Sequence, residues 1–185
     1  FRGLEIWPLE TPRLTLRPAE LTDSAALWRH RGLPEVGKWL GWHPVDRADW
    51  DVTYPEKYRD YLVVELEGNI IGDLMLRIGD GWGQREVKEQ TARVQAELGW
   101  TFAPAVGGNG YATEAVAALI SVCFDHIGLR RIEAGAFAEN EPSWRLMERV
   151  GMRRESYSVE ESLHRDLGWL DGVLYAMLAD EWHAQ

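Results

Sequence analysis

Cysteine is almost absent from this chain, since Cys123 is the single thiol among 185 residues. One thiol cannot form an intrachain disulfide, so a reducing cytoplasm is the expected location. Cys123 lies among apolar residues at helical spacing, which predicts a core position and no role as a nucleophile. The five histidines are scattered without pairs at ligand spacing, so we expect no metal site.

Long apolar runs and an excess of basic residues are also missing. No apolar stretch approaches the length of a membrane span, and the first ten residues lack the regions of a signal peptide, so we expect no membrane partner. The chain carries 30 acidic and 20 basic residues, a formal net charge of −10. Nucleic acids require a basic face, so this charge argues against a nucleic-acid partner. It is compatible with a basic peptide or amine substrate.

The composition is otherwise that of a globular protein. A length of 185 residues and a hydrophobic content of 45% predict a single domain over residues 1–185, with a sizeable core. Ten tryptophans are a high number. Packing is the favoured explanation, and the alternative is an aromatic-lined substrate cleft or an oligomer interface such as that of a homodimer.

The order of apolar and polar residues predicts many strands and few helices. Strands are predicted at residues 14–17, 61–67, 70–78, 91–102, 131–138, 159–164 and 173–179. Helices are predicted at residues 22–30, 46–59, 111–125 and 140–150, and Pro55 is expected to break or kink the second. Residues 32–45, 79–90 and 166–171 are predicted to be loops. One parallel crossover through the 111–125 helix predicts a mixed α+β sheet.

A glycine-rich turn at residues 106–115 is the most informative segment. Gly107, Gly108 and Gly110 lie between a predicted strand and a predicted helix. Such a turn directs backbone N–H groups at a phosphate, with a helix N-terminus behind them. The turn lacks the third small residue of a dinucleotide-binding fingerprint and the Gly-Lys-Ser/Thr of a Walker loop. The chain also has no G-x-S-x-G nucleophile elbow.

Residues 97–115 resemble the acetyl-CoA-binding core of the Gcn5-related N-acetyltransferases (GNAT), and more narrowly the ribosomal-protein N-terminal acetyltransferases (RimJ/RimL). The family's turn follows the pattern Q/R-x-x-G-x-G/A, and residues 107–112 match it except that Gly107 replaces Gln or Arg. Residues 11–18, 131–154 and 169–178 resemble the opening strand, the strand–helix–strand unit and the last strand of the same branch. The resemblance therefore covers most of the chain, in the family's order.

The resemblance implies the GNAT fold, which is of the α+β class. Its mixed, mostly antiparallel central sheet has about seven strands, splayed between the fourth and the fifth, and about four helices flank it. The resemblance also implies acetyl-CoA as co-substrate, no metal, and direct transfer of acetyl to a primary amine of a protein N-terminus or a small molecule. Two alternatives stay open: another acyl-CoA such as succinyl-CoA, and a module that binds CoA without turnover.

The same resemblance implies which residues bind the cofactor. Backbone groups near Thr101 and Phe102 are expected to pair with the pantetheine arm as a neighbouring strand would. The diphosphate is expected at the turn, at Gly107, Gly108, Asn109, Gly110, Tyr111, Ala112 and Thr113. Asn140 is expected against the cofactor arm, with Ser143 near the sulfur.

Two residues are candidates for the chemistry. Glu97 is the first candidate for the base, acting through water; the other interpretation is a solvated carboxylate or one that orients the substrate. Ser143 is the candidate donor to the departing thiolate, and helix capping by Asn140 and Ser143 is the alternative. Tyr157 and Tyr175 stay open as acids, because many relatives use tyrosine.

The acceptor is expected to enter among residues 39–50, 79–90 and 166–171, where tryptophans and carboxylates suit a cationic amine. An α-amine has a pKa of about 7.7–8.0, whereas that of a lysine amine is about 10.4. A single carboxylate base therefore suits an N-terminal amine better than a lysine.

Overall fold

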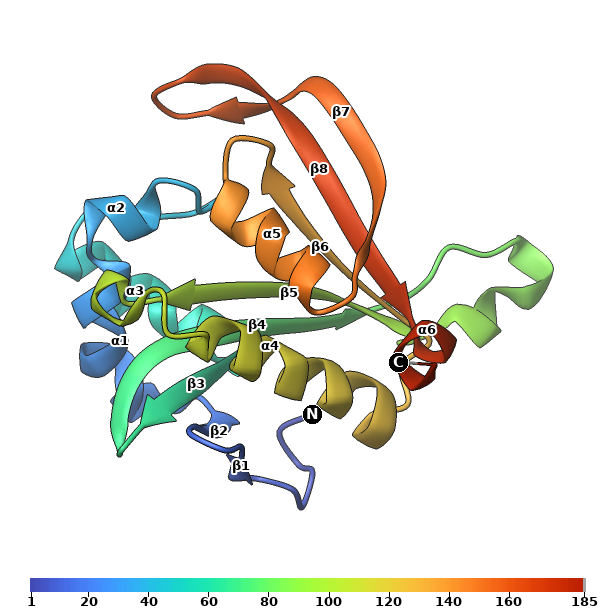
Figure 1. The fold of residues 1–185 in the computed structure, drawn as a ribbon, viewed down its shortest axis with the longest axis horizontal. Helices are drawn as coiled ribbons and strands as arrows, with labels where there is room; N and C mark the ends of the chain where they lie inside the picture. Colours follow the sequence, from blue (N-terminus) through green and yellow to red (C-terminus); the bar gives the residue numbers. More distant parts are fainter. Residues whose placement is uncertain (185) are drawn as a thin grey trace. The chain divides into compact units, whose positions relative to one another are not determined.

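One open sheet organises the chain, and a computed structural model describes it for residues 1–184. The strand order is β1-β2-β3-β4-β5-β6-β8-β7, with β5 and β6 parallel and most other pairs antiparallel (Figure 1). This confirms the predicted mixed α+β class. The sheet has eight strands, since the short β1 is added to the seven predicted.

The strands are β1 Leu9–Glu10, β2 Thr15–Pro18, β3 Tyr61–Leu66, β4 Asn69–Gly79, β5 Gln95–Phe102, β6 Arg131–Phe137, β7 Arg153–His164 and β8 Gly168–Leu178. The helices are α1 Ser24–Arg31, α2 Pro34–Gly37, α3 Arg47–Lys57, α4 Tyr111–Ser121, α5 Glu141–Arg149 and α6 Ala179–His183. Short 3-10 turns are η1 Leu21–Asp23, η2 Tyr58–Asp60, η3 Arg85–Thr91 and η4 Pro104–Val106, and a π-helical turn, η5 Val122–His126, follows α4. Within residues 1–184, none of the helices has the length and apolar character needed to cross a membrane.

The chain forms two compact units. Unit 1 contains Phe1–Leu76 and Gly99–Leu119, and unit 2 contains Arg77–Leu98 and Ile120–Gln185. Strand β4 runs from unit 1 into unit 2, and β5 runs back from unit 2 into unit 1.

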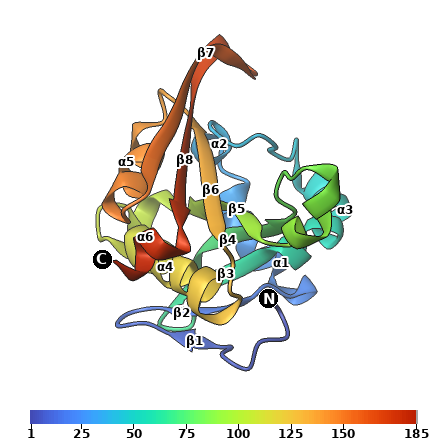
Figure 2. The ribbon, with the colours of Figure 1, turned by 90° about the vertical axis from the view of Figure 1, so that its right-hand side faces the viewer.

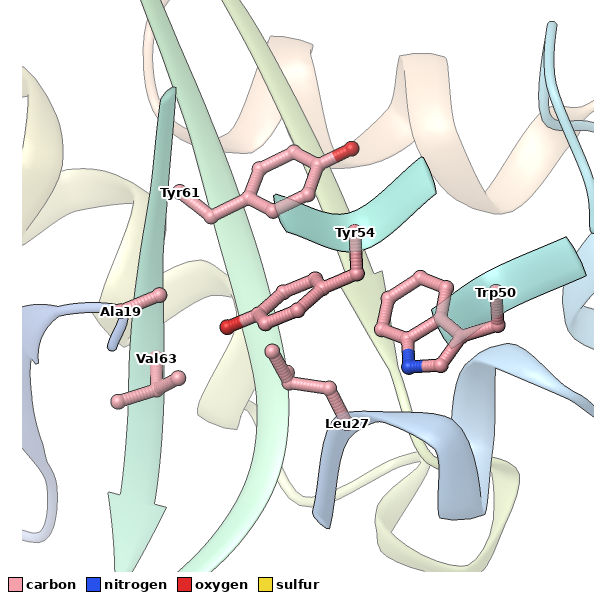
Figure 3. Close-up of a cluster of buried hydrophobic side chains, with 6 residues drawn as sticks. All are labelled: Ala19, Leu27, Trp50, Tyr54, Tyr61 and Val63. Atoms are coloured by element: carbon pink, nitrogen blue, oxygen red, sulfur yellow. The ribbon is translucent and has the colours of Figure 1, made fainter. Parts of the chain in front are cut away.

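The core of unit 1 is a cluster of aromatic and aliphatic side chains between α1, α3 and β3. Figure 3 shows its members, which are Ala19, Leu27, Trp50, Tyr54, Tyr61 and Val63. Asp46 starts α3 by accepting a hydrogen bond from the N–H of Asp49 at 2.9 Å. Trp50 and Tyr54, four residues apart, then share one face of the helix, and their rings stack with centroids 4.9 Å apart. Pro55 lies inside this helix, so the predicted break is wrong, whereas the alternative of a kink stays a prediction.

A buried charged group joins α1 to β4 within unit 1. The carboxylate of Asp73 is fully buried and accepts hydrogen bonds from Nε of Arg31 at 2.9 Å and from Nη2 at 2.5 Å. The ring of His30 lies 2.8 Å away through Nε2, and the guanidinium lies over the ring of Tyr61, 4.7 Å from its centroid. Burial raises the pKa of Asp73, but the charge of Arg31 and the hydrogen bonds from His30 and Arg31 hold it below its usual value.

Unit 2 contains the parallel crossover and a long terminal hairpin. Strand β6 lies parallel to β5, with Gln95 opposite Arg131, and antiparallel to β8. Helix α5 packs on β6, β7 and β8. The hairpin of β7 and β8 extends beyond β6 (Figure 2).

Several predicted boundaries in the chain were wrong. Strand β7 begins at Arg153 and β8 at Gly168, so most of the predicted loop at residues 166–171 is strand. Side chains along the first half of β7 are mostly exposed on both faces, which removes the alternation that marks a half-buried strand. Helix α2 and turn η3 lie in predicted loops, and the predicted strand at residues 91–102 starts at Gln95.

We expect Asp73→Asn to lower the free energy of unfolding by about 3–5 kcal/mol, because Arg31 would stay buried without its counter-ion. Urea denaturation at neutral pH measures the loss. Asp51→Asn is the matched control, since it removes one carboxylate from an exposed pair with Arg47, and its denaturation midpoint should not change.

The pH dependence provides a second readout of the same substitution. The pKa of Asp73 is lower in the folded state than its value of about 3.9 in the unfolded chain, so ionisation of this carboxylate stabilises the fold. This stabilisation is fully present above the pKa of the unfolded chain and is lost as the pH falls through the pKa of the folded state. The difference between wild type and Asp73→Asn should therefore shrink in acid. A difference in the free energy of unfolding that stays constant as the pH falls would contradict this account.

Candidate functional site

The turn between β5 and α4 is shaped by two glycines with left-handed backbone. Turn η4 ends with the N–H of Gly107 donating to the carbonyl of Pro104 at 3.0 Å. Gly108 and Gly110 then adopt φ values of +80° and +79°, a region that glycine enters at little cost. Gly107 itself has φ −60° and ψ 153°, which any residue can adopt, so its departure from the usual Gln or Arg leaves the backbone path unchanged.

The main-chain N–H groups of this turn belong to a largely exposed segment, since residues 107–110 are exposed and residues 111 and 112 are partly buried. Within residues 1–184, the structure gives no acceptor for the amides of Gly108, Asn109, Gly110, Tyr111 and Ala112. The first bond of the helix runs from the N–H of Glu114 to the carbonyl of Gly110 at 3.0 Å. Unpaired amides at the N-terminus of a helix are a site for an anion.

The side chain of Asn109 holds the turn from inside. Its Nδ2 donates to the carbonyls of Val106 at 3.1 Å and Gly107 at 3.2 Å. Asn109 therefore supports the shape of the turn through its side chain. Its main-chain carbonyl accepts a hydrogen bond from Nη1 of Arg13 at 2.9 Å. Arg13 could not be singled out from the sequence, because the contact joins residues 96 positions apart.

The end of β5 lies close to β4 within unit 1. A Cβ at Gly72 would lie 2.7 Å from the carbonyl oxygen of Thr101 and 2.5 Å from the ring of Phe102, so only glycine fits there. The N–H of Ala103 donates to the carbonyl of Ile71 at 2.8 Å. Thr101 is buried and Phe102 is partly buried. Pairing of this segment with a pantetheine arm stays a prediction.

Glu97 lies on the part of β5 that belongs to unit 2. It is opposite Glu133 in the parallel ladder, and its carboxylate accepts a hydrogen bond from Nη1 of Arg77 at 3.1 Å. The side chains of Arg77 and Glu97 are 55% and 51% exposed, and an exposed pair of this kind stabilises a protein by at most about 1 kcal/mol. Glu97 is thus accessible, as a base must be, and the alternative of a solvated carboxylate stays open.

Asn140 and Ser143 begin helix α5 in unit 2. Asn140 is the N-cap, yet its side chain makes no capping hydrogen bond. The carbonyl of Asn140 accepts from the N–H of Ser143 at 3.1 Å, and within the described chain the Ser143 hydroxyl has no hydrogen-bond partner. The capping alternative is therefore not observed, and both side chains have polar atoms available to a ligand.

The two tyrosine candidates differ in accessibility. Tyr157 is exposed and donates a hydrogen bond to the carboxylate of Asp171, which raises its pKa. Tyr175 is buried and donates to Oε1 of Glu148 at 2.9 Å, and burial together with this bond raises its pKa. Both phenols are protonated at neutral pH, and each donates its hydrogen bond to a carboxylate.

The candidate residues fall into the two units. Thr101, Phe102 and residues 107–113 belong to unit 1, whereas Glu97, Asn140 and Ser143 belong to unit 2.

Cys123 is buried, and burial raises the pKa of its thiol to about 12, which confirms its place in the core. In the described part of the chain, no group of three or more His, Cys, Asp or Glu side chains has an arrangement that could hold a metal ion.

The tryptophans of the expected acceptor region are packed in unit 1 and exposed in unit 2. Trp50 is fully buried in unit 1, and Trp42 stacks on it with ring centroids 6.1 Å apart. Packing therefore explains these two. Trp82 is 90% exposed and Trp169 is 60% exposed, so both remain available for contacts with another molecule.

Comparisons with known proteins show what this chain is similar to. The family profile described as "Acetyltransferase (GNAT) domain" matches residues 13–153. The protein described as "Uncharacterized N-acetyltransferase p20" of Bacillus licheniformis is 30% identical over 150 residues, which cover 80% of this chain and 83% of p20. The N-acetyltransferase YnaD of Bacillus subtilis is 39% identical over 87 residues, which cover 47% of this chain and only 51% of YnaD.

Solved structures show the same similarity. An acetyltransferase of the GNAT family from Bacillus anthracis has a TM-score of 0.77 at 28% identity, covering 92% of this chain and 98% of that one. Mycobacterium smegmatis RimJ in complex with CoA-disulfide has a TM-score of 0.71 at 28% identity, covering 91% and 83%. The fold implied by the sequence resemblance is thus confirmed.

We expect Gly108→Ala and Gly110→Ala each to cost about 1–2 kcal/mol, because a Cβ is strained at positive φ. Thermal unfolding measures the loss. Gly41→Ala is the control, since a Cβ at Gly41 would have no neighbour within 4 Å and its φ lies outside the left-handed region. If the three variants unfold at the same temperature, the assigned turn geometry is wrong.

Proposed function

The chain belongs to the acetyltransferase (GNAT) family, and from that membership we propose that it transfers an acetyl group from acetyl-CoA to a primary amine. The N-acetyltransferase names of its relatives support the reaction class. The complex of Mycobacterium smegmatis RimJ with CoA-disulfide supports the cofactor. The observation that carries the proposal is the run of amides from Gly108 to Ala112 at the start of α4, which have no acceptor within residues 1–184 and of which the first three belong to exposed residues. We also propose that the two units form a single domain, since the family profile spans segments of each. The proposed location is the cytoplasm.

The turn is proposed to bind the diphosphate of CoA. Left-handed backbone at Gly108 and Gly110 shapes the turn, and the absence of side chains at these two positions would let the phosphates approach the N–H groups closely. The dipole of α4 adds about 0.3–1 kcal/mol at an exposed helix end. Thr101 and Phe102 would pair with the pantetheine arm, with Asn140 against the arm and Ser143 near the sulfur.

The reaction proposed is direct attack without a covalent enzyme intermediate. The amine nitrogen uses its lone pair to form a bond to the thioester carbonyl carbon, and the carbon–sulfur bond then breaks with its electrons going to sulfur. The proton lost by the amine passes through water to the carboxylate of Glu97. The departing thiolate receives a hydrogen bond from the free hydroxyl of Ser143, and Tyr157 is the alternative acid.

The acceptor proposed is an amine that needs little help to lose its proton. An α-amine with a pKa of about 7.7–8.0 is close to neutral pH, whereas a lysine amine at about 10.4 is not. Glu97 is one accessible carboxylate, so a peptide N-terminus or a weakly basic small amine fits better than a lysine side chain. The exposed Trp82 and Trp169 and the net charge of −10 favour a cationic acceptor.

Release of free CoA from acetyl-CoA tests the proposal, with N-terminal peptides, polyamines, aminoglycosides and amino acids as acceptors. With an accepted amine, Glu97→Gln should lower kcat about 100-fold, because general base catalysis contributes at least that much. Ser143→Ala should lower kcat less, by about tenfold, because water can still protonate the thiolate.

Two variants serve as controls for these substitutions. Arg77→Met removes the guanidinium but leaves the carboxylate of Glu97 in place, so turnover should persist. Ser156→Ala removes an exposed hydroxyl on β7 and should not change kcat. If wild type binds CoA but no amine is acetylated, the chain is a CoA-binding module. If Glu97→Gln and Ser143→Ala keep the full rate, the chain is an enzyme but the catalytic assignment of these two residues fails.

A further inference from the structure

The first turn of α4 carries an acidic residue beside the proposed diphosphate site. Glu114 lies three residues after Tyr111, and its side chain is 14% exposed. A carboxylate at this end of a helix competes with any other anion for the positive end of the dipole and repels it directly. A site for a diphosphate therefore needs something that cancels Glu114.

The opening strand region supplies that group from far away in the sequence. Oε1 of Glu114 accepts hydrogen bonds from the Thr11 hydroxyl at 2.6 Å and from the N–H of Arg13 at 2.9 Å, and Oε2 accepts from Nε of Arg13 at 2.7 Å. Burial raises the pKa of Glu114, but these bonds and the charge of Arg13 hold it below its usual value. The carboxylate is thus ionised, and a guanidinium neutralises it.

The same guanidinium also holds the turn. Nη1 of Arg13 donates to the carbonyl of Asn109 at 2.9 Å, between the two left-handed glycines. The guanidinium carbon lies 4.6 Å from the centroid of the Tyr111 ring, and Nη2 lies 3.5 Å from the place where a Cβ on Gly110 would be. The side chain of Arg13 therefore contacts Asn109 in the turn, Tyr111 at the start of α4, and Glu114 one turn further along the helix.

We propose that Arg13 is a positioning residue of the cofactor site, which fixes the turn through Asn109 and cancels the negative charge of Glu114 so that a diphosphate can bind. This inference rests on the proposed function of the turn as the CoA diphosphate site. Arg13 acts through its neighbours and takes no part in the acyl transfer. Lysine cannot replace it, because the contacts to Glu114 and Asn109 use two different nitrogens of the planar fork.

Isothermal titration with CoA tests this, using Arg13→Met, Glu114→Gln and the double variant. Arg13→Met should raise the Kd for CoA about tenfold, since an uncancelled carboxylate then faces the diphosphate. Glu114→Gln should bind at least as well as wild type. The double variant should bind within about threefold of Glu114→Gln, because the harmful charge is gone. Arg47→Met, which removes one arginine from an exposed pair on α3, is the matched control and should leave Kd unchanged.

Dephospho-CoA, which keeps the diphosphate and lacks the 3′-phosphate, shows which phosphate is involved. Arg13→Met should weaken CoA and dephospho-CoA by the same factor, and with acetyl-CoA it should raise KM while kcat stays near wild type. A loss confined to CoA would mean that Arg13 contacts the 3′-phosphate directly. A double variant as weak as Arg13→Met would mean that the charge of Glu114 is not what Arg13 cancels for the diphosphate, and either result would overturn the inference.

Circular dichroism melting separates these effects from unfolding, since every variant must be folded at the titration temperature. If wild type binds no CoA, the proposed function fails and the inference fails with it. If wild type binds CoA and Arg13→Met binds it equally well, only the inference is wrong.

Discussion

Left-handed backbone at Gly108 and Gly110 is the constraint on which the rest of the site depends. Two residues with φ near +80° within three positions shape the turn between β5 and α4, and the amides from Gly108 to Ala112 have no acceptor in the described part of the chain. A chain with side chains at both positions would relax into an ordinary turn, and its amides would find internal partners. Unpaired polar groups on a rigid turn thus become a binding site, because the helix behind them cannot supply their acceptors.

The surrounding charges follow from the same constraint. A turn held open in this way has few hydrogen bonds of its own, so Asn109 and Arg13 supply them from side chains. The buried group of Asp73, Arg31 and His30 ties α1 to β4, and Gly72 brings β4 against the end of β5 at Thr101. Unit 1 therefore has a fixed frame for the turn. The accessible Glu97 and the free hydroxyl of Ser143 belong to unit 2, which carries the groups suited to proton transfer.

The sequence predicted what is local and periodic. The strands β3 and β4, the helix α4 and the glycine turn all follow from neighbouring residues. Contacts between residues distant in sequence could not be predicted. Arg13 pairs with Glu114 across 101 positions and Arg31 pairs with Asp73 across 42, and neither pair produces a local sequence pattern. The first half of β7 was missed because it lacks a buried face. The break predicted at Pro55 does not occur, because packing of Trp50 and Tyr54 favours the helix around it.

The most direct test of the central claim is a titration of isotopically labelled protein with CoA, followed by amide NMR. The account predicts that the resonances of Gly108, Gly110 and Ala112 shift the most and in parallel with saturation, because their N–H groups gain phosphate acceptors. Glycine resonances elsewhere, such as that of Gly41, should not move. Saturable binding that leaves the turn unperturbed, or no binding at millimolar CoA, would contradict the account.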